Sequence, residues 1–256
     1  MQPAEIVAAL RPVLDGALIA TDFDGTLAPL IRDPEQSRPV DGAIAALRDL
    51  ADRGAQVAVI TGRDAATVVR LGGLASVPGI VVAGLYGIET WVDGGLSSPE
   101  TPTAIEHLRE RLPEIVDGGD ADVWIEDKRL SLVVHARRAA DPAAALAALA
   151  EPVAALAGEL GLEMHPGSDV LELRLPGHDK AGALARLAAG RPGALYLGDD
   201  LGDLPAFTEL RRLRATGVPA YSIGVRSSAV ADLEGAADAD VADPAAAVAV
   251  LADLAR

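Results

Sequence analysis

Apolar and polar residues follow two different patterns in the first hundred residues of the chain. Near-continuous apolar segments alternate with segments whose apolar residues recur at helical spacing. Apolar runs of this kind are typical of strands that are buried on both faces of a sheet. The pattern therefore predicts parallel strands joined by helices. The predicted strands are 16–22, 56–63 and 79–87; the predicted helices are 41–54, with Gly54 as its C-cap, and 65–74.

After about residue 100 the predicted strands come in pairs. The segment LELRL alternates apolar and charged residues, which is typical of an antiparallel sheet with one face in water. We predict that residues 101–177 form an αββαββ insertion. Its helices are expected at 103–116 and 141–160, and its strands at 122–127, 130–138, 162–166 and 169–175.

The strand–helix alternation then returns. We therefore expect an α/β fold with a discontinuous core, residues 1–100 and 178–256, and a smaller α+β domain inserted at 101–177. The second part of the core has predicted helices at 179–190, 204–213 and 243–256, and predicted strands at 193–200 and 220–225.

Composition narrows the possible partners. The net charge is −16, from 22 Lys and Arg against 38 Asp and Glu, which argues against nucleic acid and anionic membranes as partners. A small anionic substrate is not excluded, because a local cationic pocket or a metal ion reverses the field. The absence of Cys excludes disulfides and thiolate catalysis. The first residues do not resemble a signal peptide, and there is no apolar run of about 18 residues. We expect a cytoplasmic monomer.

Polar side chains follow three of the predicted core strands. Open parallel sheets bind their ligands beyond the carboxyl ends of the strands, so we expect these side chains to meet there. A cluster of oxygen ligands of this kind suits Mg²⁺. Acids after strands also serve as helix caps or turn residues, which would explain any single Asp but explains two acidic clusters less well. The clusters are Asp22 with Asp24, Thr61-Gly62-Arg63, and Asp199 with Asp200 and Asp203.

These groups are the parts of a phosphoryl-transfer site. One carboxylate, Asp22, can attack phosphorus and form an aspartyl phosphate, and a second, Asp24, can protonate the leaving oxygen and then deprotonate water. Thr61 and Lys180 can donate hydrogen bonds to phosphoryl oxygens. Gly25 allows the backbone to turn tightly beside the phosphoryl group.

The same residues resemble a known family. DFDGT, the Thr of ITGR, Lys180 in GHDKAGAL, and GDDLGD are similar to the four motifs of the haloacid dehalogenase superfamily, and they occur in the same order. DFDGTLAPL, WIEDKRLSLVVHARR and LELRLPGHDKAGAL further resemble segments of the trehalose-6-phosphate phosphatases. The similarity spans about residues 17–210 and implies a haloacid-dehalogenase-like Rossmannoid core with an inserted cap.

The resemblance implies a role for each matching residue. Asp22 is the nucleophile, Asp24 the acid/base, and Thr61 and Lys180 bind phosphate, while Asp22, the Asp24 backbone carbonyl and Asp199 hold Mg²⁺. Whether Asp200 and Asp203 touch the metal stays open. The substrate-binding residues implied or inferred are Gly25, Gly62, Arg63, Glu126, Lys128, Arg137 and Glu172.

Simpler explanations exist for some of these residues. Lys128 lies between two predicted strands, where a hairpin turn would explain it. Arg137 and Glu172 fall on predicted strands, where a salt bridge on a wet face would suffice. Arg63 either pairs with nearby acids or touches phosphate or sugar. Trp91 and Trp124 are expected to pack and not to stack on sugar, and His135 is expected to pack or to form a hydrogen bond, without a catalytic role.

Some positions depart from the pattern of the trehalose-6-phosphate phosphatases. Gly202 and Leu204 replace a Thr and a second acid, and Ala181 replaces a Gly after Lys180. The segment 84–87, GLYG, stands where many members have Gly-x-His-Gly. The expected metal ligand Asp199 matches the family pattern, so these departures bear on sugar specificity.

The expected function is Mg²⁺-dependent hydrolysis of trehalose 6-phosphate, a phosphorylated disaccharide, with the inserted domain as a lid that hinges near 97–103 and 175–180. One alternative is the same chemistry on sucrose phosphate or a glycosyl phosphoglycerate. The other is a catalytically silent sugar-phosphate sensor, which would be expected to lose the nucleophile, the acid/base or the metal acid.

Overall fold

The chain folds into two compact units. The computed structural model describes residues 1–31, 33–118, 122–167, 169–226 and 235–256. One unit comprises Met1–Ser98 and Asp179–Arg256, and the other comprises Pro99–His178. The expected domain boundaries lie within two residues of these limits. Among the described residues, no helix has the length and apolar character needed to cross a bilayer.

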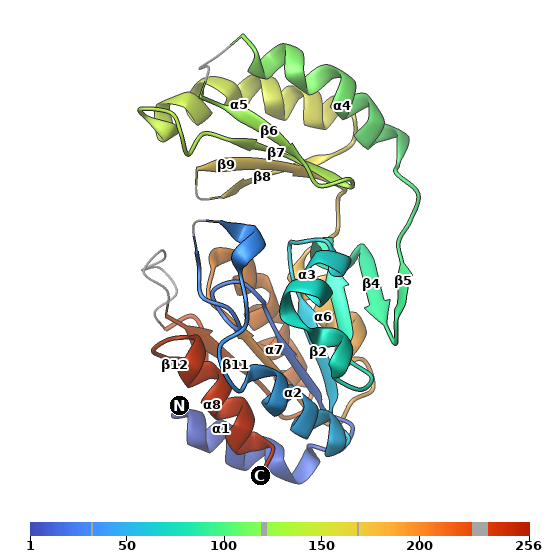
Figure 1. Cartoon of the computed structure of the whole chain (residues 1–256), viewed down its shortest axis with the longest axis vertical. Coiled ribbons are helices and arrows are strands. Elements are labelled where there is room, and N and C mark those ends of the chain that lie inside the picture. The colour runs from blue at the N-terminus through green and yellow to red at the C-terminus, as the bar shows by residue number, and fades with distance from the viewer. Residues whose placement is uncertain (32, 119–121, 168, 227–234) are drawn as a thin grey trace. The chain divides into compact units, whose positions relative to one another are not determined.

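The first unit is built on an eight-stranded sheet in the order β12-β11-β10-β1-β2-β3-β4-β5 (Figure 1). The strands from β12 to β3 are parallel, and β4 and β5 are antiparallel to their neighbours. The strand bounds are β1 Leu18–Thr21, β2 Gln56–Ile60, β3 Val81–Gly84, β4 Glu89–Val92, β5 Gly95–Ser97, β10 Ala194–Gly198, β11 Ala220–Val225 and β12 Ala239–Val241.

Helices cover both faces of this sheet, as the apolar strands require. Alternate residues of β1 point to opposite faces: Ile19 packs in a core with α1, α2, α3 and α8, whereas Leu18 and Ala20 pack in a second core with α6 and α7. The helix bounds are α1 Pro3–Leu10, α2 Ala43–Asp52, α3 Ala65–Gly72, α6 Lys180–Ala188, α7 Leu204–Ala215 and α8 Pro244–Leu254; short 3₁₀ turns are η1 Arg11–Val13, η2 Pro34–Gln36, η3 Leu74–Ser76, η4 Leu85–Gly87 and η5 Leu201–Asp203.

Local sequence sets several helix ends. The side chains of Asp64 and Asp179 accept hydrogen bonds from the third helical N–H of α3 and α6, and each such cap is worth about 1 kcal/mol. The cap at Asp179 starts α6 at Lys180. Gly54 follows the end of α2 with φ +84°, which confirms its predicted place as the helix terminator.

Strand register brings the predicted site residues to one edge of the sheet. Thr21 at the end of β1 lies opposite Leu197 of β10 and Val59 of β2. The residues that follow these three parallel strands therefore leave the sheet side by side. This is the physical reason why Asp22, Asp199 and Thr61 approach one another although they are far apart in sequence.

The hairpin β4–β5 at the edge of the sheet was not predicted. Its turn is Asp93-Gly94, and both residues have positive φ (48° and 84°). Asp-Gly between two apolar segments is a strong hairpin signal, because the type I′ turn needs positive φ at both positions. The sequence therefore contains a hairpin signal between the strand predicted at 79–87 and residue 97, a stretch for which no element was predicted.

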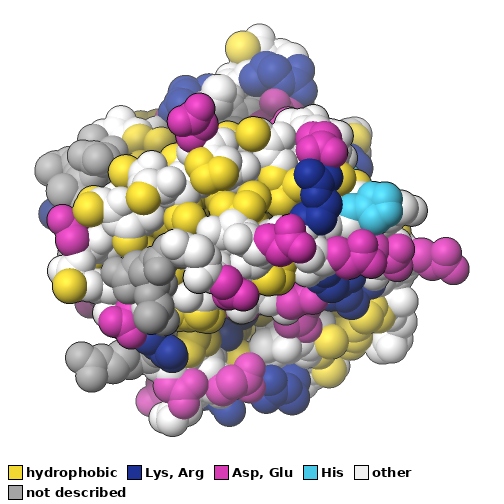
Figure 2. Space-filling model, turned by 90° about the horizontal axis from the view of Figure 1, so that it is seen from above, with side chains coloured by type: hydrophobic (Ala, Val, Ile, Leu, Met, Phe, Trp, Pro, Cys, Tyr) yellow, Lys and Arg dark blue, Asp and Glu magenta, His cyan; other side chains and the backbone are white. Residues whose placement is uncertain are grey.

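The second unit is the predicted αββαββ arrangement, with a four-stranded antiparallel sheet in the order β6-β7-β9-β8. Its elements are α4 Thr103–Val116, β6 Trp124–Asp127, β7 Ser131–His135, α5 Pro142–Glu159, β8 Glu163–Gly167 and β9 Val170–Arg174. Leu132, Val134, Leu171 and Leu173 pack against α4 and α5. The outer surface of these helices, seen in Figure 2, carries small apolar side chains among charged ones.

Candidate active site

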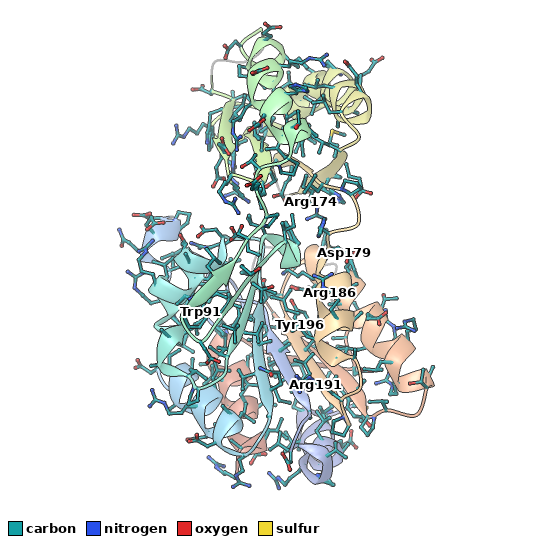
Figure 3. All side chains as sticks on the ribbon, turned by 90° about the vertical axis from the view of Figure 1, so that its right-hand side faces the viewer. Trp91, Arg174, Asp179, Arg186, Arg191 and Tyr196 are labelled. Atoms are coloured by element: carbon teal, nitrogen blue, oxygen red, sulfur yellow. The ribbon has the colours of Figure 1, made fainter. Side chains whose placement is uncertain are left out.

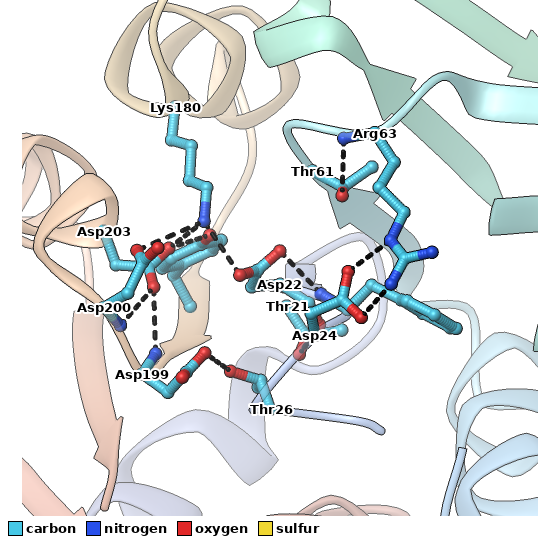
Figure 4. A network of polar contacts seen from close by, with 12 residues as sticks. Thr21, Asp22, Asp24, Thr26, Thr61, Arg63, Lys180, Asp199, Asp200 and Asp203 are labelled. Atoms are coloured by element: carbon cyan, nitrogen blue, oxygen red, sulfur yellow. Dashed lines mark hydrogen bonds and ion pairs between the residues drawn. The ribbon is translucent and has the colours of Figure 1, made fainter. Parts of the chain in front are cut away.

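Asp22 occupies the first position after β1 and is 6% exposed. Its backbone N–H donates to the Leu197 carbonyl of β10 at 2.9 Å, so the neighbouring strand fixes its position. Its Oδ1 accepts a hydrogen bond from the Phe23 N–H at 2.6 Å, and its Oδ2 lies 2.9 Å from Lys180 Nζ (Figure 4). Burial raises the pKa of Asp22 well above its ordinary value; Lys180 opposes this shift, and the nearby acids add to it.

Lys180 is buried among carboxylates. Its Nζ lies 2.6 Å from Asp203 Oδ1 and 3.7 Å from Asp200 Oδ1, in addition to its contact with Asp22. Burial alone would lower the pKa of Lys180, but Asp203 and Asp22 raise it by more, so the ammonium stays charged. Lys180 is thus an internal counter-ion for three acids.

Asp203 anchors this network and is fully buried. Its Oδ1 accepts hydrogen bonds from Lys180 and from the Tyr196 hydroxyl, both at 2.6 Å. Its Oδ2 accepts from the backbone N–H groups of Asp199 and Asp200, at 2.8 and 3.0 Å. The pKa of Asp203 is lowered, because these donors and Lys180 outweigh the effect of burial. One carboxylate therefore ties Lys180 to the backbone that presents Asp199.

Asp199 lies against the Asp22-Phe23-Asp24-Gly25 segment. Its Oδ1 accepts a hydrogen bond from Thr26 Oγ1 at 3.1 Å. A Cβ atom on Gly25 would lie 1.9 Å from Asp199 Oδ2, and Gly25 has φ +78°. Glycine is required here by both the contact and the backbone conformation. Burial, followed by repulsion from Asp203 and Asp200, raises the pKa of Asp199 to about 7.

The carboxylates at this edge of the sheet outnumber the cations that contact them, since Asp22, Asp200 and Asp203 share Lys180. Carboxylate oxygens of Asp22, Asp200 and Asp203 lie within 4.8 Å of one another, close enough for one cation. This set shares only Asp22 with the predicted ligands Asp22, Asp24 and Asp199. Burial is the main cause of the raised pKa values of Asp22 and Asp199, and repulsion from the neighbouring carboxylates adds to it, so negative charge is crowded at this edge of the sheet. A hard divalent cation with oxygen ligands fits that crowded negative charge.

The Asp24 side chain is bound by Arg63. Arg63 Nε and Nη2 donate to the two Asp24 oxygens at 2.5 Å each, and Ser37 Oγ donates to Oδ1 at 3.0 Å. Of the two roles weighed for Arg63, the structure shows the pairing with an acid. Thr61 is buried after β2, and its Oγ1 accepts a hydrogen bond from the Arg63 N–H at 3.2 Å. The next residue, Gly62, packs closely against the Tyr86 ring.

Four of the predicted substrate-binding residues, Glu126, Lys128, Arg137 and Glu172, lie in the second unit. Lys128 lies in the turn between β6 and β7, and its Nζ is 3.7 Å from Glu172 Oε1. Glu172 also accepts a hydrogen bond from Ser131 Oγ at 2.9 Å. Glu126 lies 2.7 Å from His135 Nε2, and this hydrogen bond lowers the pKa of Glu126.

Arg137 differs from its expected place. β7 ends at His135, so Arg137 is exposed in the turn that follows instead of lying on a strand. The expected packing role of Trp124 and His135 is confirmed: their rings stack with centroids 4.7 Å apart. The Arg138 guanidinium also lies over the Trp124 ring, 4.3 Å from the ring centroid.

Comparison with known proteins identifies the family. A family model described as trehalose-phosphatase matches residues 20–245. The chain belongs to the trehalose-phosphatase family. A trehalose-phosphate phosphatase from Mycobacterium avium is 37% identical over 210 residues, which cover 77% of this chain and 52% of that protein. An uncharacterized glycosyl hydrolase from Mycobacterium tuberculosis is 34% identical over 223 residues, 81% of this chain and 16% of that protein. This family member spans about half the length of the trehalose-phosphate phosphatases that it matches.

Solved structures show that the trehalose-phosphatase family member shares its fold with other proteins. The C-terminal domain of the Candida albicans trehalose-6-phosphate phosphatase has a TM-score of 0.80 at 21% identity, covering 100% of this chain and 97% of that one. A trehalose synthase regulatory protein from the same organism has a C-terminal domain with a TM-score of 0.73 at 12% identity, covering 100% and 98%. The fold alone therefore does not select a function.

Several contacts of the family member's site were not predicted from sequence. Thr26 belongs to the DFDGT motif, but the motif alone does not predict that its hydroxyl donates to Asp199. Ser37 and Tyr196 were not singled out, and each donates a hydrogen bond to a site carboxylate. No spacing rule connects Ser37 with Asp24, because the two residues do not lie on one helix or strand.

Proposed function

We propose that this protein is a Mg²⁺-dependent phosphatase that hydrolyses trehalose 6-phosphate to trehalose and phosphate in the cytoplasm, as the last step of trehalose biosynthesis. The observation that carries the proposal is the environment of Asp22: a buried carboxylate at the carboxyl end of β1, 2.9 Å from Lys180 Nζ and beside three further acids. The family and the relatives named above support the choice of substrate.

In the first step, a carboxylate oxygen of Asp22 attacks phosphorus, and the bond from phosphorus to the ester oxygen breaks. Asp24 gives a proton to the leaving oxygen, which departs as the sugar hydroxyl. In the second step, water attacks phosphorus, Asp24 takes a proton from it, and the bond to Asp22 breaks. Phosphate leaves, and both carboxyl groups return to their starting states.

The surrounding residues bind and orient the phosphoryl group. Lys180 and Thr61 are proposed to donate to its oxygens, as their places beside Asp22 and at the end of β2 allow. The Arg63 guanidinium contacts both oxygens of Asp24 and so restrains the position of the carboxyl group that is proposed to transfer protons.

Mg²⁺ is the proposed cofactor, held by Asp22, the Asp24 carbonyl and Asp199, with Asp200 and Asp203 close by. When bound, it offsets the repulsion between the phosphate and the carboxylates. The second unit is proposed as the cap that confers substrate specificity, with Glu126, Lys128, Arg137 and Glu172 binding sugar hydroxyls through charge-assisted hydrogen bonds.

Phosphate release from a panel of sugar phosphates tests the proposal. Trehalose 6-phosphate, sucrose 6-phosphate and a glycosyl phosphoglycerate are compared with and without Mg²⁺. We expect trehalose 6-phosphate to have the highest kcat/KM and its hydrolysis to need Mg²⁺. Preference for another ester would overturn the substrate, and binding without hydrolysis would indicate a sensor.

A further inference from the structure

The chain adopts a strained backbone directly after β3. Leu85 and Tyr86 have φ of 48° and 58°, the left-handed region, although neither is Gly or Asn. Such residues cost about 1–3 kcal/mol each and persist only where the surroundings hold them. They lie at the same carboxyl edge of the sheet as Asp22 and Thr61, because β3 is parallel to β2.

Two hydrogen bonds hold this segment on the turn that follows β2. The Leu85 N–H donates to the Arg63 carbonyl at 2.8 Å, and the Tyr86 N–H donates to the Thr61 carbonyl at 2.9 Å. These bonds couple the main chain at Leu85 and Tyr86 to the turn that carries Thr61.

The other end of the segment is held on α6. Arg186, labelled in Figure 3, donates from Nη2 to the Gly87 carbonyl at 3.0 Å. A Cβ on Gly87 would lie 2.8 Å from the Ala183 Cβ. Since α6 starts at Lys180, the strained segment is held between the elements that carry the two proposed phosphate-binding residues, Thr61 and Lys180.

The Tyr86 ring explains why residue 62 is glycine. A Cβ on Gly62 would lie 2.8 Å from Tyr86 Oη and 2.9 Å from its Cζ. The φ angle of Gly62 is not positive, so backbone conformation does not require glycine at this position. The requirement is contact: the phenol end of Tyr86 lies on the backbone between Thr61 and Arg63. Tyr86 itself is only partly buried.

We propose that Tyr86 is a specificity-determining residue that hydrogen-bonds, through its hydroxyl, to a sugar hydroxyl close to the phosphate ester. This inference rests on the proposed function. If Thr61 binds the phosphoryl group, the Tyr86 hydroxyl beside Gly62 is placed to meet the first atoms of the leaving group. A phenol both donates and accepts, which suits a sugar hydroxyl. Tyr86 would thereby favour polyhydroxylated leaving groups over apolar ones.

Replacement of the hydroxyl alone tests this role. Tyr86→Phe keeps the ring on Gly62, and its kcat/KM is measured with trehalose 6-phosphate and with p-nitrophenyl phosphate, which has no leaving-group hydroxyls. We expect kcat/KM for the sugar phosphate to fall about tenfold, mainly through KM, since one lost hydrogen bond is worth about 1.4 kcal/mol. With the aryl phosphate it should stay within about twofold of the wild type.

Two more variants separate specificity from structure. Tyr86→Asn tolerates the left-handed backbone and lacks the phenol, so it should show the same substrate-selective loss. Tyr221→Phe makes the identical chemical change on β11 and should leave kcat/KM unchanged with both substrates. Equal losses with both substrates in Tyr86→Phe would show a purely structural role and overturn the inference, as would no change with either.

The outcome for the wild type keeps the two proposals distinguishable. If the wild type hydrolyses trehalose 6-phosphate and Tyr86→Phe matches it, only the role of Tyr86 is wrong. If the wild type hydrolyses p-nitrophenyl phosphate but not trehalose 6-phosphate, the proposed function falls and the sugar contact of Tyr86 falls with it.

Discussion

Lys180→Met should strongly destabilise the protein, because it removes a buried ammonium that contacts three acids. Its Nζ lies 2.6, 2.9 and 3.7 Å from carboxylate oxygens of Asp203, Asp22 and Asp200, and its side chain is 4% exposed. Removal of one partner from a buried ion pair costs about 3–5 kcal/mol, because the remaining charges are left without compensation. For a domain of this size, such a loss lowers Tm by about 6–20 °C.

Arg70→Met provides a matched control. It makes the same change in net charge in the same unit, but Arg70 pairs with Glu35 at the surface, where the two side chains are 57% and 64% exposed. Exposed pairs contribute at most about 1 kcal/mol. Urea unfolding followed by far-UV circular dichroism, in EDTA at neutral pH, measures both variants. Equal stability of Lys180→Met and Arg70→Met would refute the reasoning.

Three further expectations concern the metal and a distant carboxylate. Gly25→Ala should place its Cβ against Asp199 and add about 1–2 kcal/mol of strain from the left-handed backbone. We expect it to weaken Mg²⁺ binding about tenfold, as measured by calorimetry. Unchanged binding would be evidence against a ligand role for Asp199. Mg²⁺ at about a hundred times its Kd should stabilise the wild type by about 2.7 kcal/mol in thermal unfolding, and EDTA should abolish the effect. Asp238→Asn should cost about 1.5–3 kcal/mol at neutral pH, because Asp238 accepts hydrogen bonds from Arg214 and from the Ser222 N–H and hydroxyl. Burial raises the pKa of Asp238, but these donors lower it by more, to below its ordinary 3.8. This stability is therefore present above pH 3.8 and is lost as pH falls through the lower folded value; a stability difference between variant and wild type that does not narrow as the pH falls below 3.8 would contradict this account.

The fold was accessible from sequence because its elements carry strong local signals. The buried apolar strands of the core predict a parallel sheet covered on both faces, and the alternation in LELRL predicts the antiparallel sheet of the second unit. The edge at which Asp22, Thr61 and Asp199 meet follows from parallel strands alone. The strand β12 escaped prediction because three residues carry too little pattern, whereas the β4–β5 hairpin was missed although its Asp93-Gly94 turn is a strong signal.

The site was less accessible, because its contacts depend on side-chain direction. Sequence places Asp24 two residues after Asp22, but only the structure shows that it faces Arg63 and Ser37. Likewise, Asp203 accepts hydrogen bonds from the side chains of Lys180 and Tyr196, which no spacing rule connects with it. Arg137 was placed on a strand because the predicted strand extended to residue 138, but the antiparallel pairing of β7 with β9 ends at His135.

Chemical trapping of the phosphorylated enzyme tests the central claim most directly. The protein is mixed with trehalose 6-phosphate and Mg²⁺, quenched in acid within milliseconds, digested, and analysed by mass spectrometry. We predict a phosphoryl group on Asp22 that appears before free phosphate accumulates and is absent from Asp22→Asn, which should lose about 10⁴-fold or more in kcat while keeping its fold. Rapid turnover with no phosphoryl group on Asp22, or with undiminished activity in Asp22→Asn, would contradict the account.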